Sequence, residues 1–408
     1  MPISRREWLA GAGRVALALP MAPGPASPSV DVRDDFPIAK DRVYLNNASI
    51  HPMSRASLAA AQEYLRARTH GAGPSTSPDP PVPAREAKEG FAALIGARPS
   101  EIAFVPSTTV GENLVVAGLG IPVEKGNVVT DGLHFEGSLY LYRSLLAQGL
   151  DVRMALPRQG RIDLQDLDAL IDRNTKLVAL SFVSYLNGFV HDLKAVCDLA
   201  HARGAHVYAD LIQGAGSTPL DVGASGVDFA ACSSYKWLMG DLGLGFLYVR
   251  EDLLDRVVRR SQYGFRQLKS FTYNFAPYGP AGPEPVSFEG LNTVAGHFEV
   301  GTWDSSTIVA VNQALSFIRR LGVPGIQAHN QALTRRLQKD LPRLGYESLT
   351  PVDATSSLVS FALKDEALTA AKLAAAKVDV RIFARTMRVS PSIYNTEGDI
   401  DALLNALS

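Results

Sequence analysis

Short apolar runs alternate with longer amphipathic stretches along the chain from residue 41 onward. The runs that predict strands are RVYLNN, EIAFVP, NVVTDG, DVRMAL, KLVALSFV, HVYAD, FAACSS and GFLYVR. Between them, apolar residues recur at helical spacing over 54–68, 84–95, 111–119, 136–149, 164–171 and 192–203. Such alternation is typical of a mostly parallel sheet covered by helices. The pattern therefore predicts an α/β fold.

The pattern changes after residue 305, where long Ala/Leu-rich helices are joined by the short strands LVSFAL, VDVRIF and RVSPSI. This change predicts a large domain over 58–305 and a small α+β domain over 306–408, with residues 29–57 packed on the small domain. Two Gly- and Pro-rich stretches, 70–85 and 262–297, are predicted to be irregular. The second is also rich in aromatic residues, and we expect a lid or a subunit contact there.

Composition narrows the class of protein. The 408 residues carry a formal charge of −1 and 46% hydrophobic residues, as is typical of a soluble globular protein. That charge supplies no net attraction to phosphate, so neither nucleic acid nor a membrane surface is an expected partner. Cys197 and Cys232 lie in apolar segments, and two cysteines predict neither a disulfide framework nor a metal site.

The first 28 residues differ in character from the rest of the chain. Arg5 and Arg6 in SRREWL precede a short apolar run, and small residues and prolines follow in MAPGPASP. This order resembles a twin-arginine export signal, and the run is too short to span a bilayer as a helix. A signal of this kind implies a periplasmic protein. The alternative is a basic amphipathic N-terminus on a cytoplasmic protein.

Polar side chains follow several predicted strands at the point where each strand ends. Asp210 ends HVYAD, with Gln213 just after it, and Lys236 follows FAACSS. Asn187 follows KLVALSFV, and the turn STTVGEN opens a helix after EIAFVP. Ligands bind at the carboxyl ends of the strands in open α/β sheets. Pyridoxal 5′-phosphate (PLP) needs such a set: an amine, a carboxylate beside its pyridine nitrogen, and a helix N-terminus for its phosphate.

The segment VYADLIQGAGSTPLDVGASGVDFAACSSYKWLMGDLGLGFLYVR resembles the core of the class V aminotransferase family. Its motif is D-x-x-Q and, further on, S-x-x-K-W-x-x-G-x-x-G-x-G, and the resemblance covers roughly residues 35–405. The family includes isopenicillin N epimerase-like enzymes, kynureninases and cysteine desulfurases. The resemblance implies PLP fold type I, with a mostly parallel seven-stranded sheet sandwiched by helices, a smaller α+β C-terminal domain, and a homodimer.

The resemblance also assigns roles to matching positions. Lys236 matches the Schiff-base lysine, Asp210 the partner of the pyridine nitrogen, and Gln213 a donor to the phenolic oxygen. The other cofactor-binding positions that it implies are Thr108, Thr109, Phe135, Asn187, Ser233, Tyr235 and Thr302. Among these, Phe135 is expected to stack on the pyridine face, with His134 as the alternative.

The remaining matches concern the substrate and the partner subunit. Arg388 matches the arginine that binds the substrate α-carboxylate, a role suited to its bidentate fork. Asn47 and His51 lie where relatives line the substrate mouth, although both could be plain turn residues. Thr302 matches a residue that reaches the phosphate from the partner subunit.

One departure from the family pattern bears on the reaction. Cysteine desulfurases need a nucleophilic cysteine shortly before the carboxylate-binding arginine, and VDVRIFARTMR has none. The predicted function is a PLP enzyme, aminotransferase- or epimerase-like, that acts on the α-amino group or Cα of an amino acid or peptidyl amino acid through an internal aldimine at Lys236. The alternatives are a C–S or C–C lyase of the kynureninase kind and a catalytically silent binding protein with the same fold.

Overall fold

The computed structural model describes residues 32–71, 82–121, 123 and 125–408. The predicted export signal at 1–28 lies outside the described residues, and so does most of the loop predicted at 70–85. Within the described part of the chain, no helix combines the length and the apolar character needed to cross a membrane.

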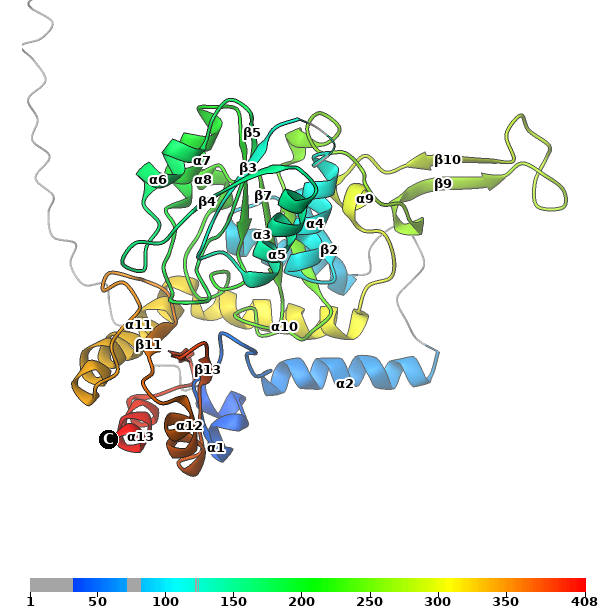
Figure 1. Ribbon diagram of the computed structural model, residues 1–408. Coiled ribbons are helices and arrows are strands. Elements are labelled where there is room, and N and C mark those ends of the chain that lie inside the picture. The colour runs from blue at the N-terminus through cyan, green and yellow to red at the C-terminus, as the bar shows by residue number, and fades with distance from the viewer. Residues whose placement is uncertain (1–31, 72–81, 122, 124) are drawn as a thin grey trace, which may run out of the picture. The chain divides into compact units, whose positions relative to one another are not determined.

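A seven-stranded sheet forms the centre of the fold (Figure 1). Its strands, in spatial order, are β2 (Ile102–Val105), β8 (Gly245–Val249), β7 (Phe229–Ser233), β6 (His206–Asp210), β5 (Thr175–Ser181), β3 (Asn127–Asp131) and β4 (Asp151–Ala155). Strand β8 runs opposite to the other six strands, which are parallel to one another. The predicted mostly parallel seven-stranded sheet is confirmed.

Helices cover both faces of this sheet. They are α3 (Val82–Ile95), α4 (Thr108–Gly118), α5 (Glu136–Ala147), α6 (Leu164–Leu170), α7 (Leu193–His201), α8 (Val222–Ser225), α9 (Val294–Phe298) and α10 (Ser305–Leu321). Along β5, Leu177 and Ala179 pack in the core with α4 and α5, while Val178 and Leu180 pack in the core with α3 and α7. Because successive side chains point to opposite faces, a strand covered on both sides is apolar throughout.

The C-terminal part has a core of its own. It contains α11 (Val323–Asp340), α12 (Glu366–Ala375), α13 (Glu397–Leu407) and a three-stranded antiparallel sheet of β11 (Val359–Ala362), β14 (Thr386–Val389) and β13 (Arg381–Phe383). The predicted strand RVYLNN lies here rather than in the large sheet, because β1 (Val43–Tyr44) pairs with β12 (Val378–Asp379). Helix α10 packs against α3 and α2 (Arg55–Thr69), so the predicted division at residue 305 stays a prediction.

The segment predicted to be irregular at 262–297 contains a β-hairpin. Strand β9 (Leu268–Tyr273) pairs antiparallel with β10 (Val286–Gly290), and the hairpin projects from the body of the molecule (Figure 1). The prediction is wrong over these strands because their short alternating runs adjoin a Gly/Pro-rich tip, whose composition hid them. The hairpin exposes several large aromatic side chains, namely Phe271, Tyr273, Phe275, Tyr278 and Phe288.

Candidate active site

Lys236 and Asp210 lie at the same edge of the large sheet. Asp210 is the last residue of β6, and Lys236 lies in the turn that follows β7. Their exposed fractions are 2% and 8%. Burial raises the pKa of Asp210 to about 6 and lowers the pKa of Lys236 to about 8. Each charge also acts on the pKa of the other, which places the carboxylate and the amine in one local field.

Gln213 is held in place by hydrogen bonds at both ends of its amide. Its Nε2 donates to the carbonyl of Ala48 (3.0 Å), and its Oε1 accepts from the indole Nε1 of Trp237 (3.0 Å). Trp237 directly follows Lys236, so this pair ties the lysine turn to the segment after β6. The loop that contains Ala48 and His51 is tied to the lysine turn as well, because the backbone amide of His51 donates to the carbonyl of Tyr235 (2.9 Å).

The predicted phosphate turn lies at the N-terminus of α4. The backbone amide of Thr108 donates to Ser233 Oγ, and the amide of Ser233 donates to Thr108 Oγ1, both over 2.8 Å. These reciprocal bonds join the start of α4 to the end of β7. Thr109 is exposed in the first turn of the helix. Ser107 Oγ also accepts from the amide of Val110 (3.2 Å), and the N-terminus of this eleven-residue helix favours an anion such as phosphate.

Arg388 lies on β14 with an exposed fraction of only 4%. Its Nη1 donates to the carbonyl of Tyr185 (2.9 Å) and its Nη2 to Ser49 Oγ (2.7 Å), whereas its buried Nε has no hydrogen-bond partner among the described residues. Burial lowers the pKa of Arg388 to about 10. Arg388 in turn acts to lower the pKa of Lys236, and its partner Ser49 lies in the same loop as Ala48 and His51, which are bonded to Gln213 and Tyr235.

The two candidates for the ring-stacking position have different surroundings. His134 is fully buried, and its ring nitrogens lie 2.8 Å from Ser181 Oγ and 3.2 Å from Glu112 Oε1. Phe135 is half-buried and packs edge-on against Tyr185, with ring centroids 5.5 Å apart. The His134 ring is inaccessible in this chain and Phe135 is partly exposed, so Phe135 is the ring that a cofactor can reach. Stacking by Phe135 stays a prediction.

Three other predicted site residues make contacts within the protein. The Asn187 side chain donates to the carbonyl of Gly160 (2.7 Å), and Asn47 donates to that of Ser390 (2.8 Å). His51 is 1% exposed, its Nε2 lies 2.8 Å from Ser392 Oγ, and burial lowers its pKa to about 4. These contacts show structural roles, and their contacts with cofactor or substrate stay predictions.

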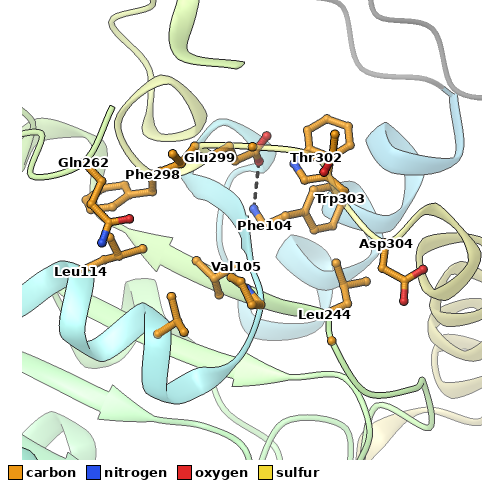
Figure 2. A pocket seen from close by; sticks show the side chains of 15 residues that line it. Phe104, Val105, Leu114, Leu244, Gln262, Phe298, Glu299, Thr302, Trp303 and Asp304 are labelled. Atoms are coloured by element: carbon orange, nitrogen blue, oxygen red, sulfur yellow. Dashed lines mark hydrogen bonds between the residues drawn. The ribbon is translucent and has the colours of Figure 1, made fainter. Parts of the chain in front are cut away.

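Tyr235 and Thr302 are the two remaining residues predicted to contact the phosphate, and both contacts stay predictions. Tyr235 is half-buried, with its ring centroid 5.7 Å from Lys236 Nζ. Thr302 is exposed and lines a cavity of about 140 Å³ whose walls include Phe104, Val105 and Leu114 (Figure 2). Lys236 is not among the residues lining that cavity, so the cavity is separate from the lysine site.

Sequence reasoning missed the buried carboxylate behind the site. Glu112, on α4, is 1% exposed and accepts hydrogen bonds from Ser138 and from the Tyr142 hydroxyl (2.8 Å), besides its contact with His134. Burial alone would lower the pKa of His134, but Glu112 raises it above the ordinary value. Glu112 is part of the motif STTVGEN, but its partners Ser138 and Tyr142 come from another helix. No spacing pattern in the sequence links those residues to Glu112.

The residues at this sheet edge fit PLP. A buried carboxylate can face the ring nitrogen, an amine of lowered pKa can hold the aldehyde, and a helix N-terminus can take the phosphate. Among the described residues no cluster of side chains could hold a metal ion. A mostly parallel sheet with this set defines a PLP-dependent enzyme of fold type I. The chain belongs to the aminotransferase class-V family, whose model matches residues 43–403, and PLP is its cofactor.

Known relatives support this family assignment, but they are named for different activities. A probable cysteine desulfurase of Methanothermobacter thermautotrophicus is 29% identical over 314 residues, which is 75% of this chain and 74% of that protein. An uncharacterized aminotransferase of Bacillus subtilis, YcbU, is 28% identical over 77% of this chain and 80% of its own length. The structure of the cysteine desulfurase CsdA of Escherichia coli superimposes with a TM-score of 0.80 at 23% identity, covering 93% of this chain and 97% of that chain.

Proposed function

We propose that this protein acts on the α-amino group or Cα of an amino acid or peptidyl amino acid, as an aminotransferase- or epimerase-like PLP enzyme. The observation that carries the proposal is the grouping of Lys236, Asp210 and Arg388 in one buried electrostatic environment. PLP, when bound, supplies an electron sink for the bond broken at Cα. Arg388 would hold the substrate carboxylate, and Asp210 would keep the ring nitrogen protonated.

Lys236 has the properties of both an anchor and a base. A pKa near 8 leaves a substantial neutral fraction of its amine at neutral pH, which an ordinary exposed lysine lacks. A neutral amine can hold the cofactor covalently and, once released from it, can take a proton from Cα. The buried Lys236 is therefore the residue whose loss should abolish both functions.

Persulfide formation on a cysteine of this chain is not part of the proposal, although relatives are named cysteine desulfurases. The chain has two cysteines, Cys197 and Cys232, and each is 1% exposed. Burial raises the pKa of Cys197 to about 12 and that of Cys232 well above its ordinary value. A thiol nucleophile must be accessible and ionised, so neither side chain suits the role.

A C–S or C–C lyase reaction is the second candidate, and the names of the desulfurase relatives favour it. Cleavage of a C–S bond in a substrate needs Lys236, Asp210 and Arg388 but no protein thiol. The two candidates differ in their products. Transamination yields a keto acid with the cofactor as pyridoxamine phosphate, whereas lysis releases pyruvate or alanine and leaves the cofactor unchanged.

To test the proposal, the purified protein is incubated with pools of amino acids and peptides. Keto acid with pyridoxamine phosphate, and pyruvate or alanine, are then measured as the products of the two candidate reactions. Wild type should show the visible absorbance of lysine-bound PLP, Lys236→Ala should lose it, and the exposed Lys194→Ala should keep it. A Cys197→Ala/Cys232→Ala double variant should keep its activity. Failure of the wild type to bind added PLP would overturn the proposal, as would full activity in Lys236→Ala.

We also propose that the enzyme is a periplasmic homodimer. The exposed aromatic hairpin and the exposed Thr302 support the dimer, and the Arg5–Arg6 motif supports export. Sedimentation at several concentrations tests the dimer. Fractionation of cells that carry the wild type or an Arg5→Lys/Arg6→Lys variant tests export.

A further inference from the structure

A second arginine lies beside Arg388 at the proposed substrate position. Arg381, on β13, is the direct cross-strand partner of Arg388 on β14, so the two side chains project from the same face of the sheet. Both guanidinium groups lie over the ring of Phe383, at 5.8 and 5.9 Å from its centroid. The two positive charges are close enough for Arg381 to depress the pKa of Arg388.

Neither arginine is neutralised by a carboxylate. No described residue forms an ion pair with Arg381 or Arg388, and Arg381 is exposed whereas Arg388 is buried with an unpaired Nε. Two adjacent like charges without counterions destabilise each other, and an anion that spans them would relieve the repulsion.

Aromatic rings form a wall beside the two arginines. Phe383 stacks on Tyr185 with centroids 6.2 Å apart, and Tyr185 meets Phe135 edge-on at 5.5 Å. Tyr185 also connects the wall to Arg388 through its carbonyl, and its hydroxyl donates to Glu136 (3.1 Å). Glu136 thus contacts the hydroxyl end of Tyr185, whereas Arg388 contacts its backbone carbonyl. A substrate carboxylate is therefore drawn to the arginine end of the wall.

We propose that Arg381 forms a second anion subsite and that the preferred substrate carries a second carboxylate beyond its α-carboxylate. The inference rests on the proposed function, in which Arg388 binds the α-carboxylate. Arg381 then binds the distal carboxylate, and the methylene groups between them lie along Phe383 and Tyr185. Arg388 is buried and binds the α-carboxylate that every amino acid has, whereas Arg381 is exposed and binds the side-chain carboxylate that only acidic amino acids have. The pair therefore selects acidic amino acids over neutral ones.

Unreactive acids test this subsite in the PLP-loaded enzyme. The probes are succinate, glutarate and adipate, each compared with the monocarboxylate of equal length: butyrate, valerate and hexanoate. Binding is measured by calorimetry and by the change in the visible absorbance of the bound cofactor. For the best-fitting length we expect the dicarboxylate to bind about tenfold more tightly than its monocarboxylate.

Arg381→Gln should remove this preference and leave monocarboxylate binding unchanged. The matched control is Arg385→Gln, an exposed arginine in the turn that joins β13 to β14. The inference is overturned if the two classes of acid bind equally to the wild type, or if Arg381→Gln keeps the preference. Loss of PLP loading would instead count against the proposed function, so the two failures can be told apart by the cofactor absorbance of each sample.

Discussion

At the scale of single residues, the proposed role of Lys236 makes cofactor uptake depend on the charge of its amine. Only the neutral amine attacks an aldehyde, and burial lowers the pKa of Lys236 to about 8. The neutral fraction grows as the pH rises through that value. We therefore predict that the rate of covalent PLP attachment to the cofactor-free protein rises between pH 7 and 9, with a midpoint near 8. Borohydride trapping followed by mass spectrometry of the Lys236 peptide measures this rate.

The neighbours of Lys236 should move this midpoint in opposite directions. Asp210 raises the pKa of Lys236 and Arg388 lowers it. Asp210→Asn should therefore shift the midpoint to lower pH, and Arg388→Gln should shift it to higher pH. The exposed pair of Lys194 and Asp198 supplies the control, since Asp198→Asn should leave the midpoint in place. Shifts of equal sign in the Asp210 and Arg388 variants would contradict the shared local field.

A second prediction at this scale concerns the buried carboxylate of Glu112. It accepts hydrogen bonds from Ser138 and Tyr142 and faces His134, so every neighbour presents a donor. A glutamine would turn an N–H₂ group toward at least one of these donors. Glu112→Gln should lower the free energy of unfolding by about 2–4 kcal/mol. Urea titration measures the loss, and the exposed Glu63→Gln on α2 should change it by less than about 0.5 kcal/mol.

At the scale of elements, Asp228 joins the ends of four neighbouring segments. It lies just before β7, is fully buried, and accepts from the amide of Val207 on β6 (2.8 Å) and from His201 at the end of α7 (2.8 Å). Arg250, which follows β8, approaches it to 2.8 Å. Burial would raise the pKa of Asp228, but the hydrogen bonds from His201 and Val207, together with the nearby ring of His206 (3.6 Å), hold that pKa well below its ordinary value.

The sign of the pH effect follows from this lowered pKa. A carboxylate whose pKa is lower in the folded than in the unfolded protein stabilises the fold at any pH above its unfolded pKa, about 3.9. This contribution is lost as the pH falls from that value through the folded pKa. We predict that Asp228→Asn lowers the free energy of unfolding at pH 7 by about 2–4 kcal/mol and flattens the decline below pH 4. Urea unfolding at pH 3 to 7 tests both parts. Asp252→Asn, which removes an exposed partner of the same Arg250, should cost less than about 1 kcal/mol.

Elements with a continuous apolar pattern were predicted more accurately from the sequence than elements without one. Seven of the eight strand runs became the central sheet, because strands buried on both faces are continuously apolar. The hairpin β9–β10 was missed because its strands are exposed and lack a buried face. At the site, the sequence singled out Lys236 and Asp210 because both lie at the carboxyl ends of predicted strands, and the structure places them at one edge of the sheet, while their roles toward the cofactor stay predictions. Glu112 and Arg381 could not be singled out in this way, because their roles depend on residues brought together from distant segments by packing.

At the scale of the whole molecule, the predicted role of Thr302 makes each active site depend on two subunits. Thr302 is exposed beside the cavity of Figure 2, and the structure of one chain places it outside the hydrogen-bonded turn of Thr108 and Ser233. If it binds the cofactor phosphate of a partner, a carboxylate at this position would repel that phosphate. We predict that Thr302→Asp weakens PLP binding at least about tenfold, since a like charge at close range costs more than about 1.4 kcal/mol.

Mixed dimers distinguish a contact across the interface from a contact within one chain. Lys236→Ala cannot hold PLP covalently, and Thr302→Asp retains it poorly on dialysis. In a mixed dimer, the intact Lys236 of one subunit meets the intact Thr302 of the other, so one site of the two is restored. Random reassociation of equal amounts makes about half of the dimers mixed and restores about one quarter of all sites. Dialysis-resistant PLP at that level is the expected result. In the control, Thr355→Asp changes an exposed threonine elsewhere, so its mixture with Lys236→Ala should retain PLP in about one half of all sites both before and after reassociation. Absence of any recovery after mixing would place Thr302 in its own subunit's site or outside the site altogether.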